Sequence, residues 1–300
     1  MKNTSTKILF FGNERLVSGL KHTDAPVLNG LIEHGYDVRA IISHHSDSQS
    51  RNKRHLEVAE IGEQHNIPVL LPNKPTDIFD QIAAYKADVA ILVAYGRIIP
   101  QKVIDLFPMG IINVHPSLLP RYRGPTPIES AIINGDSHTG VSIMQLTAGM
   151  DSGPVYGQAT IPLTQTEDKF DAYNKLSQAG SELLFKLLPS ILDGSLQPSK
   201  QNESEATYSS LLNKTDGHLD LMTLTATQAE RYIRAYLGFP KTKLTVNNHP
   251  IVVTKAHIVA TKESSLDLEC KGPSYLRIDQ LIAPSGRTMD GEAFLRGYAA

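Results

Sequence analysis

One apolar and β-branched run decides how this chain folds: Ala87-Asp88-Val89-Ala90-Ile91-Leu92-Val93-Ala94-Tyr95-Gly96. A second run, Gly110-Ile111-Ile112, leads directly into the polar stretch that begins Asn113-Val114-His115. Strands that are buried on both faces read as continuous apolar runs of this kind, so the two runs predict strands of a parallel sheet. The chemistry is therefore expected where the burial ends, at the carboxyl end of the second strand.

The residues around these runs alternate between strand-like and helix-like segments. Strand-like runs occupy 7–11, 36–42 and 67–70, and helix-compatible stretches occupy 25–34, 56–65 and 77–86. Such alternation favours a parallel sheet with helices on its faces. Residues 141–146 alternate between apolar and polar, and residues 170–188 are a long amphipathic helix candidate. We therefore predict an α/β domain over residues 1–196, with a doubly wound, Rossmann-like and mostly parallel sheet.

The composition changes after residue 196. Residues 197–210 are polar, as linkers are, and we expect them to connect two domains. Beyond them, a helix is expected at 225–236, and short strands at 243–246, 251–258, 265–269 and 275–280 are separated by turn signals. Strands of this length and spacing predict a small β-barrel or meander, so we expect an OB-like C-terminal domain over residues 211–300.

Composition excludes several classes of protein. The 300 residues carry a net charge of -2, so binding to a polyanion by bulk electrostatics is excluded and any nucleic-acid contact must be local. The single cysteine, Cys270, excludes an internal disulfide and a multi-cysteine zinc site. No run reaches the roughly 20 apolar residues of a membrane span, and Met1–Thr6 leave no room for a signal peptide. We expect a cytoplasmic protein.

Three side chains are candidates for catalysis. Asn113 and His115 lie two residues apart at a strand end, so the period of a strand puts them on one face. An amide and an imidazole there can both donate hydrogen bonds to a carbonyl oxygen that gains negative charge. The alternative is that Asn113 ends the strand and His115 packs. Asp151 lies between Gly149 and Gly153, which permit an irregular backbone that brings an acid into a cleft, although an Asx-turn explains it equally well.

Other candidates carry less weight. Ser117 lacks the Gly-x-Ser-x-Gly elbow that exposes a nucleophile, so covalent catalysis is disfavoured. The proline-rich loop 118–127 carries Arg121 and Arg123, which suit a rigid wall facing an anionic substrate, with solvated surface arginines as the alternative. The adjacent His44-His45 stands in a polar stretch typical of a solvated loop, so we expect no metal site.

Several motifs together carry a family resemblance. In the first domain they are Phe10-Phe11-Gly12, Val93-Ala94-Tyr95-Gly96-Arg97-Ile98-Ile99-Pro100, Asn113-Val114-His115-Pro116-Ser117-Leu118-Leu119-Pro120-Arg121-Tyr122-Arg123-Gly124, Thr139-Gly140-Val141-Ser142-Ile143-Met144 and Gly149-Met150-Asp151-Ser152-Gly153. In the second domain they are Ile233-Arg234-Ala235-Tyr236, Leu281-Ile282-Ala283-Pro284-Ser285-Gly286 and Ala293-Phe294-Leu295-Arg296-Gly297. The chain resembles the folate-dependent formyltransferases over nearly its whole length, and most closely those that act on methionyl-tRNA.

The resemblance implies transfer of the formyl group of 10-formyltetrahydrofolate to the α-amino group of methionyl initiator tRNA, for translation initiation, by a metal-free monomer. The family's catalytic triad falls on Asn113, His115 and Asp151. Its folate-binding segments fall on Val93, Ala94, Tyr95, Gly96, Ile98, Ser117, Leu118, Leu119 and Pro120. One alternative is a sugar-nucleotide N-formyltransferase that uses the same donor, against which the C-terminal resemblance argues. Another is a non-catalytic RNA-binding protein with a vestigial α/β domain.

Contacts with tRNA are expected at two places. The segment 43–55 is shorter than the basic tRNA loop of the family, but Arg51, Lys53 and Arg54 suffice for phosphate contacts. In the second domain, a local cationic strip is expected from Lys241, Lys243, Lys255 and Lys262, although scattered solubilising lysines explain them equally well.

Overall fold

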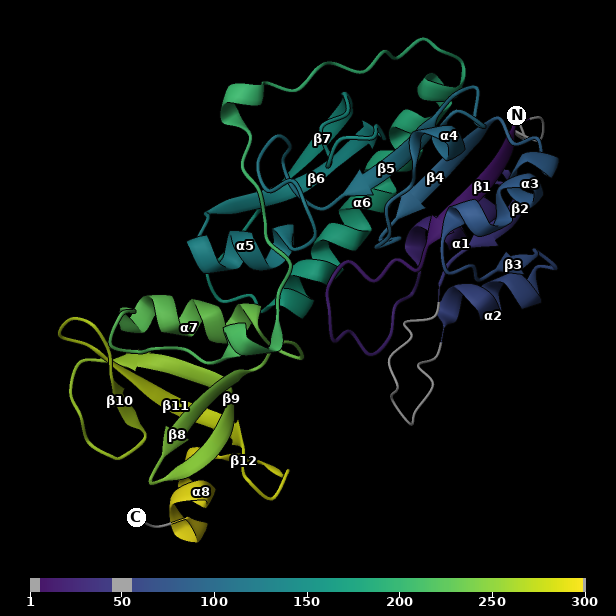
Figure 1. Cartoon of the computed structure of the whole chain (residues 1–300). Coiled ribbons are helices and arrows are strands. Elements are labelled where there is room, and N and C mark those ends of the chain that lie inside the picture. Colours follow the sequence, from purple (N-terminus) through teal and green to yellow (C-terminus); the bar gives the residue numbers. More distant parts are fainter. Residues whose placement is uncertain (1–5, 45–55, 299–300) are drawn as a thin grey trace.

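A computed structural model of the chain describes residues 6–44 and 56–298. Its first sheet has seven strands in the order β3-β2-β1-β4-β5-β6-β7 (Figure 1). The strands from β3 to β5 are parallel to their neighbours, and β6 and β7 join antiparallel, which confirms the Rossmann-like, mostly parallel sheet. The bounds are β1 Lys7–Gly12, β2 Asp37–Ile42, β3 Val69–Leu70, β4 Val89–Val93, β5 Ile111–His115, β6 His138–Gln145 and β7 Val155–Pro162.

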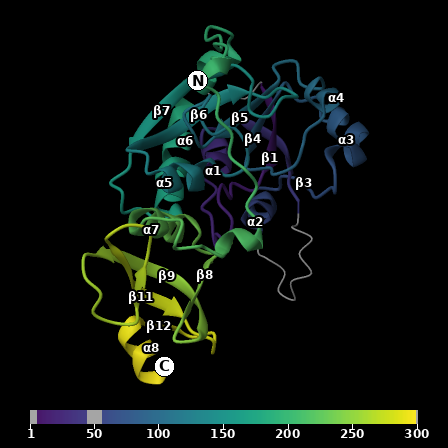
Figure 2. The ribbon, with the colours of Figure 1, turned by 60° about the vertical axis from the view of Figure 1, so that its left-hand side comes forward.

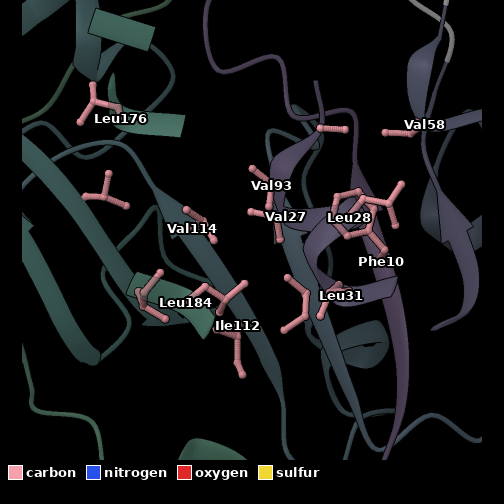
Figure 3. Close-up of a cluster of buried hydrophobic side chains, with 14 of the residues drawn as sticks. Phe10, Val27, Leu28, Leu31, Val58, Val93, Ile112, Val114, Leu176 and Leu184 are labelled. Atoms are coloured by element: carbon pink, nitrogen blue, oxygen red, sulfur yellow. The ribbon is translucent and has the colours of Figure 1, made fainter. Parts of the chain in front are cut away.

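Helices cover both faces of this sheet, and each face has its own apolar core. Helices α1 (Pro26–Glu33), α5 (Pro127–Asn134) and α6 (Lys169–Leu192) pack into the first core, and Val58 of α2 (Glu57–Gln64) joins them. Helices α3 (Phe79–Ala84) and α4 (Gln101–Ile104) pack into the second. Figure 3 shows Ile112 and Val114 of β5 among the side chains of the first core. Since alternate residues of a strand face opposite sides, Asn113 and His115 face the other way.

Helix α6 is the longest element of the first core, and its start follows from the sequence. Asp168 caps its start by accepting hydrogen bonds from the backbone N–H of Phe170 at 2.7 Å and of Asp171 at 3.0 Å. In its middle, Gly180 lies against the sheet, and a Cβ there would come within 2.9 Å of the side chain of Val114. A glycine at this point lets the helix approach the strand that carries Asn113 and His115.

The second sheet has five strands, with the order β10-β11-β9-β8 and β12 paired to β11. Every pairing is antiparallel, and the curled sheet lies between α7 (Ala226–Ala235) and α8 (Gly291–Gly297), which both contribute side chains to a third core (Figure 2). This arrangement confirms the OB-like expectation. The bounds are β8 Thr242–Val246, β9 His249–Val259, β10 Asp267–Glu269, β11 Tyr275–Ile282 and β12 Thr288–Asp290.

Some elements are shorter than their sequence patterns suggested. The helix expected at 77–86 is divided into η1 (Pro75–Ile78) and α3. The strand expected at 265–269 begins only at Asp267, because its carboxylate accepts hydrogen bonds from the backbone N–H of Glu263 and Ser264 and holds them in a turn. Arg277 binds the same carboxylate at 2.6 Å, so the pKa of Asp267 lies well below its usual range.

The chain between α6 and α7 arches over the sheet near β7 and then descends past α5 to the second sheet (Figure 1). It contains the short helices η2 (Glu203–Glu205) and η3 (Lys214–Gly217). A second connection between the two sheets runs through Lys169, which is fully buried. Its Nζ donates to the carbonyl oxygen of Phe239 at 2.8 Å and lies 3.6 Å from Glu129 Oε1.

Among the described residues, no helix is both long and apolar enough to span a bilayer.

Candidate active site

The site is centred on the end of β5. Asn113 and His115 are each only 5% exposed, and they point away from the core that holds Ile112 and Val114. The Oδ1 atom of Asn113 is buried and has no hydrogen-bond partner in the described part of the chain. Buried polar atoms in folded proteins are nearly always paired, so an amide oxygen left open at a strand end is suited to receive a donor from a bound substrate.

The imidazole of His115 has one nitrogen in use and one nitrogen open to the site. Nε2 lies 3.1 Å from the carbonyl oxygen of Tyr122, and since a carbonyl can only accept, Nε2 must carry a proton and donate it. Nδ1 lies 3.7 Å from Asp151 Oδ2. In the neutral ring Nδ1 is therefore a proton acceptor, and in the charged ring its proton faces the carboxylate.

Asp151 reaches His115 from the turn between β6 and β7. Its φ is 44°, in the left-handed region, and its side chain is 17% exposed. The carboxylate accepts a hydrogen bond from the backbone N–H of Gly124 at 2.7 Å. A Cβ at Gly153 would lie 1.9 Å from the carbonyl oxygen of Gln145, so this turn requires glycine there. The irregular backbone expected around Asp151 is present, and it places the acid beside His115.

The loop after β5 does not offer the free cationic wall suggested by its arginines. Arg123 is 1% exposed, and its guanidinium donates to Gln201 and Glu203. The bond to Glu203 is the main cause of a raised Arg123 pKa. Arg121 pairs with Asp136 at 3.0 Å. The interpretation as a wall facing an anion is therefore wrong for Arg123, because protein groups already enclose its charge.

Ser117 is part of the same loop and is 1% exposed. Its Oγ donates to the carbonyl oxygen of Arg121 at 2.6 Å, so the hydroxyl fixes the loop. Leu119 is also buried, and its backbone N–H and carbonyl are bound by Ser142 and Gln158. Of the four predicted folate residues here, Leu118 and Pro120 are the partly exposed ones.

The other predicted folate segment follows β4. Gly12 and Val93 are paired at the ends of β1 and β4, where the chain order of the sheet reverses. A Cβ on Gly12 would lie 1.8 Å from the carbonyl oxygen of Val93, so the two strand ends meet closely. Parallel sheets bind ligands in the crevice at such a switch point.

The loop after Val93 exposes its backbone and one apolar side chain. Ala94 and Gly96 have φ values of 50° and 69°, and Ile98 is 87% exposed. Tyr95 points inward, is 1% exposed and packs edge-on against Phe11. Burial raises the pKa of Tyr95 to about 12. The side chain of Tyr95 thus belongs to the core, and Gly96 and Ile98 are the predicted folate residues most open to a ligand.

The structure describes two of the five predicted nucleic-acid residues, Lys241 and Lys243. Arg51, Lys53 and Arg54 lie outside the described residues. Lys241 is exposed and lines a cavity of about 600 Å³ between the two sheets, together with Lys21 and His22. Lys243 Nζ lies 3.5 Å from the carbonyl oxygen of Lys214 and 3.4 Å from His218 Nε2.

Two further groups near the site were not singled out from the sequence. Gln201 donates to the carbonyl oxygens of Asp151 and Gly153, both at 2.7 Å. Glu14 is fully buried and accepts from the backbone N–H of Val27 and Leu28 at the start of α1. Within residues 6–44 and 56–298, no group of three histidine, cysteine, aspartate or glutamate side chains is placed to hold a metal ion.

Comparison with known proteins shows the family to which the chain belongs. The sequence profile described as formyl transferase matches residues 11–188, and that of the formyl transferase C-terminal domain matches residues 211–299. The chain belongs to the formyl transferase family. The end of β5, with Asn113 and His115, lies inside the first match. Within this family it belongs with the methionyl-tRNA formyltransferases.

Two relatives carry that assignment. The methionyl-tRNA formyltransferase of Lactobacillus acidophilus is 35% identical over 266 residues, which cover 87% of this chain and 82% of the relative. The methionyl-tRNA formyltransferase of Coxiella burnetii is 32% identical over 309 residues, which cover 98% of this chain and 96% of the relative.

Solved structures share the fold at much lower identity. An N-formyltransferase from Helicobacter canadensis, in complex with folinic acid and dTDP-3-aminofucose, has a TM-score of 0.67 at 18% identity, covering 92% of this chain and 98% of that one. HypX from Aquifex aeolicus, in complex with tetrahydrofolic acid, has a TM-score of 0.68 at 17% identity and covers 97% of this chain. The chain spans 47% of HypX, about half of its length. Identity at this level shows a common fold alone.

Proposed function

We propose that this protein transfers the formyl group of 10-formyltetrahydrofolate to the α-amino group of methionyl initiator tRNA, the step that prepares this tRNA for translation initiation. One observation carries the proposal: relatives named methionyl-tRNA formyltransferase align with 98% of the chain, through both sheets. The arrangement of Asn113, His115 and Asp151 supports it, because these three side chains can serve an acyl transfer from nitrogen to nitrogen.

The chemistry assigns a role to each of the three side chains, and the open Oδ1 of Asn113 accepts a hydrogen bond from the attacking amine. The amine attacks the formyl carbon, a C–N bond forms, and the carbonyl oxygen becomes an oxyanion that the amide N–H of Asn113 stabilises. His115 Nδ1 accepts the proton that the amine loses, and Asp151 at 3.7 Å stabilises the imidazolium. The imidazolium then returns this proton to N10 of the folate as the bond between N10 and the formyl carbon breaks. Tetrahydrofolate and formylated methionyl-tRNA leave.

The substrates are placed by the ends of neighbouring strands. We assign the folate to the crevice after β4, where the backbone of Ala94–Gly96 and the side chain of Ile98 are open, with Leu118 and Pro120 of the β5 loop beside it. We assign the phosphates of the tRNA to Arg51, Lys53 and Arg54 and to Lys241 and Lys243. Residues 1–196 form the catalytic domain, 197–210 the connection and 211–300 the tRNA-binding domain. The enzyme acts as a monomer in the cytoplasm, where translation takes place.

The decisive experiment offers the purified protein two acceptors with 10-formyltetrahydrofolate as donor. We expect formylation of methionyl initiator tRNA and no product with a dTDP-linked amino sugar. The amino-sugar reaction is a matched comparison, because the structure with folinic acid and dTDP-3-aminofucose has the same fold. Formylation of the amino sugar alone would replace the proposed acceptor, and folate binding without product on either would contradict a catalytic role.

A further inference from the structure

We infer that Gln201 is a positioning residue for Asp151, so that the segment between the two sheets completes the active-site framework. The inference rests on the proposed function, because Asp151 is assigned its role there. It depends on a closed series of hydrogen bonds. The series links His115 and Asp151 through residues 122–124, and Gln201 joins this tripeptide back to Asp151.

The tripeptide Tyr122-Arg123-Gly124 holds both catalytic partners. The carbonyl oxygen of Tyr122 accepts from His115 Nε2 at 3.1 Å, and the backbone N–H of Gly124 donates to Asp151 Oδ2 at 2.7 Å. Any displacement of these three residues therefore changes the position of the imidazole relative to the carboxylate.

The tripeptide itself is held by residues 197–210, the connecting segment between α6 and α7. The backbone N–H of Arg123 donates to the carbonyl oxygen of Thr207 at 2.9 Å, and the N–H of Ser209 donates to the carbonyl oxygen of Arg123 at 2.8 Å. The Oγ1 of Thr207 accepts from the N–H of Tyr122 at 2.9 Å. The connecting segment thus binds the backbone of the catalytic loop in the manner of an added strand, with Arg123 bridged to Tyr208.

Gln201 closes the ring of contacts. Its Oε1 accepts from Arg123 Nε at 3.1 Å and from Nη2 at 2.9 Å. Its Nε2 donates to the carbonyl oxygens of Asp151 and Gly153, both at 2.7 Å. One amide therefore makes four hydrogen bonds, its full capacity, and it joins the Arg123 guanidinium directly to the backbone of Asp151.

Asp151 needs such support for two reasons. Its left-handed backbone is unfavourable for a residue with a Cβ, and such conformations persist only when the surroundings hold them. Its carboxylate stands 3.7 Å from His115 Nδ1, so a shift of a fraction of an ångström decides whether the two are hydrogen-bonded. Misplacement of a catalytic group by about 1 Å can cost about 100-fold in rate.

The test uses Gln201→Met, which keeps the length of the side chain and removes all four hydrogen bonds. The control is Gln197→Met in the same segment, where an exposed amide donates to the carbonyl oxygen of Gly194. We expect Gln201→Met to lower kcat by about 10- to 100-fold. We expect the KM for 10-formyltetrahydrofolate to stay within about twofold, because the folate segments are not bound by Gln201. Gln197→Met should keep the wild-type kcat.

A double-mutant cycle separates positioning from general stability. In an Asp151→Asn background, Gln201→Met should reduce the remaining turnover by less than about threefold, since residues that act through one another are not additive. If the two losses multiply, or if Gln201→Met retains the wild-type kcat, the inference is overturned.

A spectroscopic readout keeps the inference testable without turnover. The ring ¹⁵N signals of His115 should change in Gln201→Met and not in Gln197→Met, and unchanged signals in both would overturn the inference. Gln201→Glu gives a second variant in case Gln201→Met does not fold. It keeps an acceptor for Arg123 but sets a carboxylate oxygen against two carbonyls, so it should lower kcat as well. If the wild type formylates only the amino sugar, the proposed function fails and the same cycle on that acceptor still tests Gln201.

Discussion

The loops after β4 and β5 leave neighbouring strands at the same edge of the sheet, yet they are built in opposite ways. The β5 loop is tied inward: Ser117 binds Arg121, and Arg123 is 1% exposed among groups from residues 201–209. The β4 loop is open: Gly96 is exposed, and Ile98 is 87% exposed. Groups that move protons need a fixed geometry, whereas a surface that receives a flat folate ring must be accessible. The difference predicts that changes at the tied residues of the β5 loop affect kcat and that changes in the β4 loop affect KM.

The largest effect on kcat is expected at the end of β5 and at Asp151 beside it. Asn113→Ala, His115→Ala and Asp151→Ala should each lower kcat by roughly 100- to 10,000-fold, because each removes a group that acts on the charge or proton of the transition state. The affinity for methionyl-tRNA, measured by filter binding, should remain, because these side chains do not provide phosphate contacts.

The molecule contains a matched control for this experiment. His257 on β9 lies 2.7 Å from Asp279, but this histidine is 52% exposed and belongs to the second sheet. His257→Ala removes a histidine–aspartate pair of similar chemistry and should leave kcat within about twofold, as expected of an exposed pair. A normal kcat in all three variants of the β5 site would contradict the assigned roles.

The next effect is on the free energy of unfolding. It concerns Glu14, whose backbone is bound to the end of β4, where the open loop begins. Glu14 follows β1, and its backbone N–H donates to the carbonyl oxygen of Val93 at 3.3 Å. Burial raises the pKa of Glu14 to about 7 from 4.5, although the N–H groups of Val27 and Leu28 oppose the shift. Between these pH values the folded state binds more protons than the unfolded state, so stability falls as the pH rises. The full shift corresponds to about 3 kcal/mol.

Urea unfolding at pH 5 and pH 8 tests this contribution. At pH 5, Glu14→Gln should be less stable than the wild type, because the amide replaces a protonated acid that fits the start of α1. At pH 8 the difference should shrink or reverse, since the variant has no buried charge. Glu182→Gln, an exposed residue of α6, is the control and should follow the wild type at both pH values. An identical pH dependence in Glu14→Gln and the wild type would show that Glu14 does not titrate in this range.

The sequence was sufficient for the parts of the site that depend on local periodicity. Asn113 and His115 lie two residues apart at the end of an apolar strand, and the period of two places them on one face of the sheet. The glycines around Asp151 likewise indicated an irregular turn, and the left-handed backbone is there. Local pattern therefore gave both halves of the His115–Asp151 pair, and the family resemblance joined them.

The remainder depends on contacts that no local pattern encodes. Arg123 and Gln201 are 78 residues apart, and around Gln201 the sequence shows only a polar composition. Helix α5 was not anticipated because its first residue, Pro127, closes a proline-rich run that reads as a loop. Strand β7 contains Gly157, which weakens a strand pattern but lets the side chain of Leu187 approach the sheet. Gln201 and Gly157 thus serve tertiary contacts that their local signals do not reveal, and Pro127 begins a helix that the neighbouring prolines hide.

The smallest effect is expected at Ile98, where the openness of the β4 loop is tested directly. Its side chain is exposed, so a folate that covers it would bury apolar surface. Ile98→Ala should raise the KM for 10-formyltetrahydrofolate by about fivefold, equivalent to about 1 kcal/mol of lost burial, and leave kcat at saturation unchanged. Ile258→Ala removes an isoleucine that is 43% exposed on β9 and should change neither constant. An unchanged KM in Ile98→Ala would place the folate away from the β4 loop, and a lowered kcat would mean that this loop also positions the reacting groups.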